Sequence, residues 1–81
     1  MRIKVKFFSV YREIAGTGEL MREVGTGARV KDVLEGLSKE FPLLKKYGKE
    51  LVVSVNRSYA SDDTKLKEGD EVALLPPVSG G

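Results

Sequence analysis

The stretch ARVKDVLEGLSKEFP (residues 28–42) decides the fold, because it carries the one long helical pattern in the sequence. Its apolar residues recur at the spacing of a helix that buries one face, and charged residues fill most positions between them. Pro42 ends the pattern, since a proline inside a helix removes a hydrogen bond and clashes with the preceding turn. One amphipathic helix covers one face of a sheet, so the sequence predicts a two-layer α+β fold. The apolar stripe consists of Val30, Val33, Leu34, Leu37 and Phe41.

Gly36 lies inside this predicted helix. A glycine at such a position costs about 1 kcal/mol relative to alanine, because its backbone loses more freedom on folding. Two interpretations stay open: Gly36 lets the helix approach the sheet closely, or it is a tolerated accident.

Two strands are predicted before the helix. RIKVKFF (residues 2–8) alternates with a period of two, which is typical of a half-buried strand, and ELMREV (residues 19–24) alternates less regularly. Between them, SVYREIAG (residues 9–16) predicts one or two helical turns, with Ser9 as N-cap and Gly16 as the stop. In the first strand Ile3, Val5 and Phe7 share one face, and Arg2, Lys4, Lys6 and Phe8 share the other.

Shorter elements follow the helix and complete a mixed sheet around it. The order of elements is strand, strand, long helix, strand, short strand, strand. This order resembles that of the ubiquitin-like β-grasp, in which the first and last strands pair in parallel at the sheet centre. The predicted elements are a connection with a short turn (43–50), a central strand (51–56), a turn with a strand stub (56–61), a turn at Gly69 with positive φ (67–70) and a last strand (71–77).

Composition excludes most familiar catalytic mechanisms. The 81 residues contain no Cys and no His, which removes thiolate chemistry and the commonest general base near neutral pH. Fourteen basic residues against twelve acidic ones give a net charge of +2, a balance too even to indicate nucleic acid. The chain has neither the apolar run of a secretory signal nor a segment of membrane-spanning length. We therefore expect a cytoplasmic protein that binds neither membrane nor nucleic acid.

The charged clusters of the sequence predict no site. Asp62 and Asp63 are adjacent carboxylates without a third ligand nearby, so a role in a turn is favoured over a metal site. The glycines of residues 25–27 lack the spacing and the lysine of a phosphate-binding loop and predict a turn. Without interleaved aromatic residues, a solvated surface is the favoured interpretation of the lysines. These lysines are Lys31, Lys39, Lys45, Lys46 and Lys49.

Apolar residues also fall on the sheet face that the helix leaves uncovered. Phe8 follows Phe7 and Leu75 follows Leu74, and in a strand neighbouring side chains point to opposite faces. One member of each pair is therefore left outside the core. Together with Tyr59 in the turn region, these residues predict an apolar patch beside the C-terminus, and such patches mark interfaces. We predict that Phe8, Tyr59 and Leu75 contact a partner protein.

The last residues, PPVSGG (76–81), are the remaining candidate for chemistry. Pro76 and Pro77 end the last strand and hold the exit extended, because proline donates no hydrogen bond and fixes φ. The glycines after them lack a Cβ and form a thin thread that fits a narrow tunnel. The sequence predicts a folded domain over residues 1–77 and a flexible diglycine tail over 78–81, with the Gly81 carboxylate as its reactive group.

The whole chain resembles the small subunits of molybdopterin synthase, which belong to the ubiquitin-like sulfur carriers with a C-terminal diglycine. The run LKEGDEVALLPPVSGG (66–81) is the most specific part of the resemblance, because it joins a turn, a strand, a double proline and the diglycine. Sister carriers for thiamin synthesis, transfer RNA thiolation or protein conjugation share the diglycine but usually differ ahead of it. The resemblance rests on IKVKFF (3–8), REIAG (12–16), VKDVLEGL (30–37), VN (55–56) and LKEGDEVALLPPVSGG (66–81).

The resemblance implies a carrier that is not an enzyme alone and binds no cofactor itself. By this resemblance, an E1-like enzyme is expected to use ATP to adenylate the Gly81 carboxylate, after which a sulfur donor protein yields a thiocarboxylate. The large subunit of the synthase is expected to receive the tail, and the sulfur to pass to a pyranopterin precursor to form the molybdopterin dithiolene. The residues expected to bind these partners are Gly80, Ser79, Val78, Pro77, Leu75, Phe8 and Tyr59.

Two alternatives to a carrier for molybdopterin stay open. The first is a related carrier that would deliver sulfur to thiamin or transfer RNA, or would join proteins through the same Gly81. The second is a basic binding module with an incidental tail.

Overall fold

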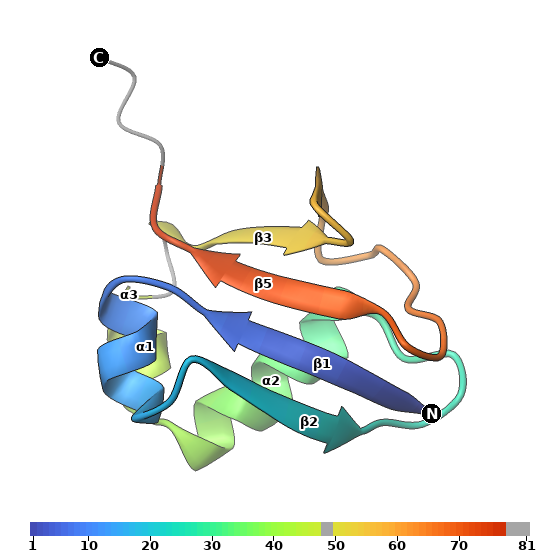
Figure 1. Cartoon of the computed structure of the whole chain (residues 1–81), viewed down its shortest axis with the longest axis horizontal. Helices are drawn as coiled ribbons and strands as arrows, with labels where there is room; N and C mark the ends of the chain where they lie inside the picture. The colour runs from blue at the N-terminus through green and yellow to red at the C-terminus, as the bar shows by residue number, and fades with distance from the viewer. Residues whose placement is uncertain (48–49, 78–81) are drawn as a thin grey trace.

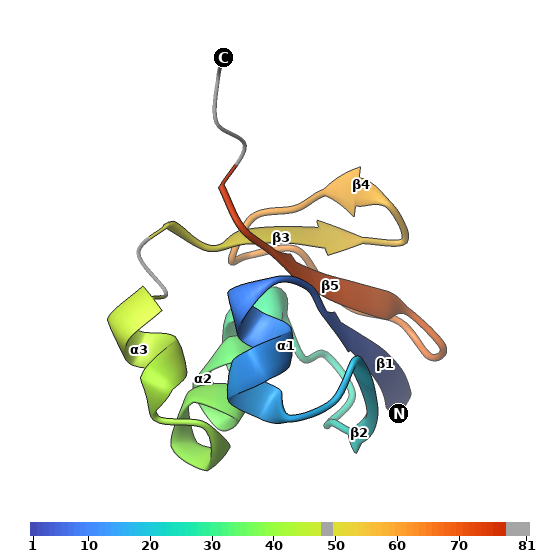
Figure 2. The same cartoon turned by 60° about the vertical axis from the view of Figure 1, so that its left-hand side comes forward.

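The protein folds into two layers. A computed structural model describes residues 1–47 and 50–77, and within them a five-stranded mixed sheet packs against three α-helices (Figure 1). After a 60° turn the helices are seen together on one side of the sheet, while its other face is uncovered (Figure 2). The predicted two-layer α+β fold is confirmed.

The sheet has the strand order β2-β1-β5-β3-β4. β1 and β5 pair in parallel next to each other, and the remaining neighbours are antiparallel. The expected parallel pairing of the first and last strands at the sheet centre is therefore confirmed. The strands are β1 (Arg2–Phe7), β2 (Glu19–Glu23), β3 (Val52–Val55), β4 (Ser58–Tyr59) and β5 (Glu71–Leu75).

The core lies between the sheet and α2 (Val30–Glu40). The inward face of β1 is Ile3, Val5 and Phe7, as its alternation predicts, and all three side chains are buried. The ring of Phe7 meets that of Phe41 edge to face, with centroids 6.1 Å apart. Of the predicted helical stripe, Val30, Val33 and Leu37 are buried, whereas Leu34 and Phe41 are partly buried against the same cluster.

Both ends of α2 differ from the predicted range of 28–42. Ala28 accepts a hydrogen bond from the Leu66 N–H at 3.0 Å, so the chain before the helix pairs with another loop. Arg29 is extended, and its N–H donates to Asp32 Oδ2 at 2.8 Å, which caps the first turn. At the other end Phe41 leaves helical geometry, because the residue before a proline is disfavoured there.

The glycine expectation for α2 is corrected. A Cβ built at Gly36 would meet no heavy atom within 4 Å. The interpretation that Gly36 permits close approach of the helix to the sheet is therefore wrong, and its position borders open space.

The two short helices match predicted turns, with one change. α1 (Val10–Ala15) ends at Gly16, whose left-handed φ of 76° confirms the predicted stop. Ser9 occupies the N-cap position but has a φ of 53° and no side-chain capping bond, so the predicted capping role is wrong. α3 (Leu43–Tyr47) confirms the short turn after Pro42.

Polar ties close the end of the sheet at β3, β4 and β5. Asn56 and Arg57 both have positive φ, 51° and 69°, as a two-residue type I′ hairpin requires. The Asn56 Nδ2 donates to Asp70 Oδ1 at 2.9 Å, and its Oδ1 accepts from the Glu71 N–H at 3.0 Å. Asp70 Oδ2 also accepts from the Lys67 N–H at 2.8 Å, so this buried carboxylate has partners on both oxygens. Gly69 has the predicted positive φ, 83°.

Within residues 1–47 and 50–77, no helix is both long and apolar enough to cross a membrane. The cytoplasmic location stays a prediction.

Candidate partner-binding face and tail root

Two pairs of identical neighbours divide between the core and the open face of the sheet. Phe7 and Leu74 enter the core, with 2% and 0% of their surface exposed. Phe8 is 43% exposed, and Leu75 is half-buried on the other side. The N–H of Phe8 donates to the Leu74 carbonyl at 3.2 Å, which continues the parallel pairing past the end of β1.

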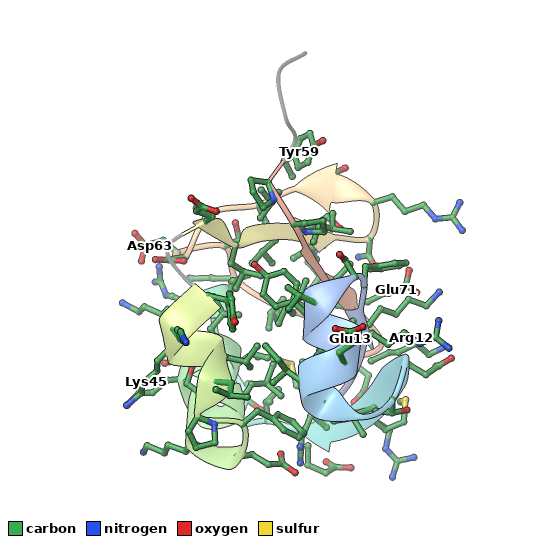
Figure 3. All side chains as sticks on the ribbon, turned by 90° about the vertical axis from the view of Figure 1, so that its left-hand side faces the viewer. Arg12, Glu13, Lys45, Tyr59, Asp63 and Glu71 are labelled. Atoms are coloured by element: carbon green, nitrogen blue, oxygen red, sulfur yellow. The ribbon has the colours of Figure 1, made fainter. Side chains whose placement is uncertain are left out.

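The open face carries a hollow of about 440 Å³, here called the open-face hollow. Its middle is low because Ser54 and Ala73 are small and lie opposite each other in neighbouring strands. Tyr59 pairs with Ser54 across β3 and β4, and its ring projects outward from the body of the molecule (Figure 3). The hollow is lined by Lys6, Phe8, Ser54, Arg57, Tyr59, Glu71, Ala73 and Leu75.

An ion pair forms the polar side of the open-face hollow. Lys6 Nζ lies 3.1 Å from Glu71 Oε1, between the two parallel strands β1 and β5. The hydrogen bond from Lys6 holds the pKa of the Glu71 carboxyl below its ordinary value, and the charges of Lys4 and Arg57 act in the same direction. The hollow thus presents apolar surface and a fixed ion pair side by side.

The chain leaves the sheet at Pro76 and Pro77, here called the tail root (Figure 1). A second hollow of about 310 Å³ lies beside it, lined by these prolines with Val10 and Tyr11 of α1, Lys46 and Tyr47 of α3, and Glu50. The Tyr11 hydroxyl donates to the Tyr47 carbonyl at 3.3 Å and joins the two helices there. Burial raises the pKa of Tyr11, so its hydroxyl stays protonated as a donor.

The structure brings Phe8, Tyr59 and Leu75 together around one hollow, as the strand pattern predicts. Pro77 lies at the tail root on the adjoining surface. The predicted tail residues Val78, Ser79, Gly80 and Gly81 lie outside the described residues. That any of these residues contacts a partner stays a prediction.

Sequence reasoning missed the residues that shape the hollow. Ser54 and Ala73 alternate with buried core residues on β3 and β5, and small side chains at outward positions were the available signal. Lys6 and Glu71 are far apart in the sequence, so only the parallel pairing of β1 with β5 shows that they meet.

The charged clusters are placed as the sequence predicts for surface groups. Asp62 and Asp63 form a turn, and Asp63 Oδ1 faces Lys31 at 3.6 Å and Arg29 at 3.9 Å. Lys39 lies 4.0 Å from Glu35 on the exposed side of α2. Lys45 and Lys46 lie on α3, with the Lys46 ammonium 5.8 Å from the centre of the Tyr47 ring. Lys49 lies outside the described residues.

A mixed sheet with this strand order, packed on one main helix, defines a ubiquitin-like β-grasp protein. Comparison with known proteins narrows this class. The chain belongs to the ThiS family, whose model matches residues 5–81.

Relatives of the chain are named as sulfur carriers and modifiers. It is 42% identical to the molybdopterin synthase sulfur carrier subunit of Chlamydomonas reinhardtii, over the full length of both chains. The crystal structure of SAMP1 from Haloferax volcanii superimposes with a TM-score of 0.84 at 31% identity, covering all of both chains. In the complex of subunits 1 and 2 of the molybdopterin-converting factor from Helicobacter pylori, one chain matches with a TM-score of 0.71 at 27% identity, again over both full lengths.

Proposed function

We propose that this chain is the sulfur carrier subunit of a molybdopterin synthase and bears the sulfur as a thiocarboxylate on Gly81. The observation that carries the proposal is the full-length likeness to the Chlamydomonas subunit of that name. The ubiquitin-like β-grasp sheet and the match to the ThiS family over residues 5–81 support the same proposal.

Activation must precede sulfur transfer. A terminal carboxylate has an ordinary pKa of about 3.5 and is ionised near neutral pH, which makes it a poor electrophile. An E1-like enzyme would transfer AMP from ATP to the Gly81 carboxylate and release pyrophosphate. Hydrosulfide supplied by a sulfur donor protein would then displace AMP from the acyl carbon and leave the thiocarboxylate. The thiocarboxylate sulfur would pass to the pyranopterin precursor to form the dithiolene, and water attacking the acyl carbon would restore the Gly81 carboxylate.

The folded domain would bind the partner and so hold the tail in place. Ordering a free chain end in a partner's tunnel costs conformational entropy, which the affinity of a second contact must offset. The open-face hollow runs along β5 from Glu71 to Leu75, the residue before the tail root, and it offers Phe8, Tyr59 and Leu75. We assign this face to the large subunit, in keeping with the complex of two subunits known for the Helicobacter pylori protein.

The chemistry is tested by intact mass spectrometry. The chain is incubated with ATP, a sulfide source and its cognate E1-like activating enzyme, and we expect the mass increase of one oxygen replaced by sulfur at the C-terminus. Deletion of Gly81 should abolish the increase and leave the unfolding midpoint unchanged, since the described core ends before the tail. A full-length chain that never gains the mass with any activating enzyme contradicts the proposal.

The docking face is tested with the large subunit. Replacing Phe8, Tyr59 and Leu75 by Glu should weaken binding, because three charges would enter an apolar contact. Leu43→Glu is the matched control, as Leu43 is exposed on α3 and does not line the open-face hollow. Unchanged affinity of the triple variant contradicts the assignment of this face.

A second candidate function is conjugation to other proteins through the Gly81 carboxylate. It is favoured by the likeness to SAMP1, whose Methanosarcina acetivorans counterpart is named small archaeal modifier protein 1. The two functions separate by product: co-purification with a large subunit supports the first, and isopeptide adducts on lysines of other proteins support the second.

A further inference from the structure

β2 is an edge strand of the five-stranded sheet. The Phe7 N–H donates to the Gly18 carbonyl and the Val24 N–H to the Met1 carbonyl, so alternate residues from 18 to 24 direct their backbone toward β1. In this register Glu19, Met21 and Glu23 direct their backbone groups outward. This side of β2 can therefore accept another strand.

A hollow of about 250 Å³ lies between this edge and α2. Its helix side is formed by Asp32, Gly36 and Glu40, spaced one turn apart, with Val33 and Leu37 in the next row. Arg22, Glu23 and Val24 form its β2 side, and Arg22 pairs with Glu40 across it. The volume is below the range of about 300–1,000 Å³ usual for small-molecule sites and suits one or two side chains of a peptide.

Gly36 gives the strongest sign that this space is kept open. A helical glycine costs about 1 kcal/mol relative to alanine, yet a Cβ at this position would meet no heavy atom within 4 Å beyond its own helical turn. Internal packing therefore does not require the glycine. A segment from outside the chain could use the room that the missing side chain leaves beside Val33 and Leu37.

The other side of the same edge carries two carboxylates and an exposed apolar side chain. Glu19 and Glu23 project to the open face of the sheet, where they pair with Lys4 at 3.5 Å and Arg2 at 3.2 Å. Met21 lies between them and is 53% exposed. A basic side chain on an added strand would place each carboxylate between two positive charges.

We infer that β2 and the α2 hollow bind an extended segment of another protein, in which β-branched residues alternate with Lys or Arg. The backbone of the segment pairs with Met21 and Glu23. Its β-branched side chains enter the hollow beside Gly36, and its basic side chains face Glu19 and Glu23. This inference does not rest on the proposed function.

A second copy of this chain fits the edge poorly. Antiparallel pairing of two β2 strands about Met21 would set Glu19 of one copy against Glu23 of the other, and like charges opposite each other destabilise a sheet.

The proposed site on β2 lies away from the tail root. Arg22 and Glu23 pair with Ile3 and Arg2 at the start of β1, whereas Leu75 and the tail root lie at the far end of the parallel strand β5. One segment can therefore occupy β2 while the tail is engaged elsewhere.

The probe is the capped peptide Lys-Val-Lys-Val-Lys-Val-Lys, added to the ¹⁵N-labelled full chain. We expect saturable shifts of the amides of Met21, Glu23 and Gly36. The same peptide with Glu in place of Lys is the charge control and should cause no saturable shift. Absence of saturable shifts with the basic peptide, equal binding of both peptides, or shifts confined to the open-face hollow would each overturn the inference.

Gly36→Leu tests the hollow without weakening the fold. Leucine favours the helix over glycine and would fill the space, so the unfolding midpoint should not fall, while the peptide should bind about tenfold more weakly, the factor for one lost aliphatic contact. Lys39→Leu is the matched control, because it adds a leucine to the same helix outside the hollow and removes no carboxylate. Equal peptide affinity of Gly36→Leu and the unaltered chain overturns the inference.

Discussion

The two faces of the sheet use the same residue types for opposite purposes. Phe7 and Phe8 are adjacent, as are Leu74 and Leu75, yet the first of each pair is buried under α2 and the second borders the open-face hollow. Their backbones belong to the same two central chain segments. Strand alternation, and not residue type, therefore separates the side chains that stabilise this fold from those that are free to contact a partner.

The leucine pair gives the largest expected contrast. Leu74→Ala should lower the free energy of unfolding by about 2–5 kcal/mol, because it removes a fully buried side chain and leaves a cavity. Leu75→Ala is the matched change on the next residue and should cost less than about 1 kcal/mol, since its side chain keeps contact with water. Urea denaturation of both variants measures the contrast. Similar losses from the two substitutions would show that the open face also forms part of the core.

The polar ties at the end of the open face give the next effect. Asp70→Ala should cost roughly 1–3 kcal/mol, because the Lys67 N–H and the Asn56 side-chain amide would both lose their acceptor. Asp62→Ala is a suitable control, as that side chain is exposed in its turn and should change stability by less than about 0.5 kcal/mol. Thermal unfolding compares the two variants. An Asp70 variant as stable as the control would mean that the strands below the hollow need no such support.

The fold followed from the sequence wherever one period governed a long segment. The alternation of residues 2–8 and the apolar stripe of α2 predict Ile3, Val5, Val33 and Leu37 in the core, and all four are buried. The ends of α2 were harder to predict, because Ala28 bonds to Leu66, and such a contact between distant loops leaves no local pattern.

The candidate site was predictable only in part. Phe8 and Leu75 follow from alternation, and Tyr59 from its turn. Ser54 and Ala73 shape the hollow because their side chains are small, and a small side chain carries no chemical group that marks a site in the sequence. Gly36 is a further example of what the sequence leaves open. A glycine inside a helix is unusual, but only the open space around it in the structure distinguishes a surface recess from close packing.

The Lys6–Glu71 pair on the open face gives the smallest expected effect. Its hydrogen bond lowers the pKa of Glu71 from the ordinary 4.5, so the folded state favours the ionised carboxylate. That stabilisation is fully present above pH 4.5 and is lost as the pH falls through the lowered pKa. Glu71→Gln should therefore be slightly less stable than the unaltered chain at neutral pH, and the difference should shrink in acid. Because the pair is partly exposed, added salt should reduce the difference as well. Denaturation at several pH values measures it, and a difference that grows in acid would contradict the assigned direction of the shift.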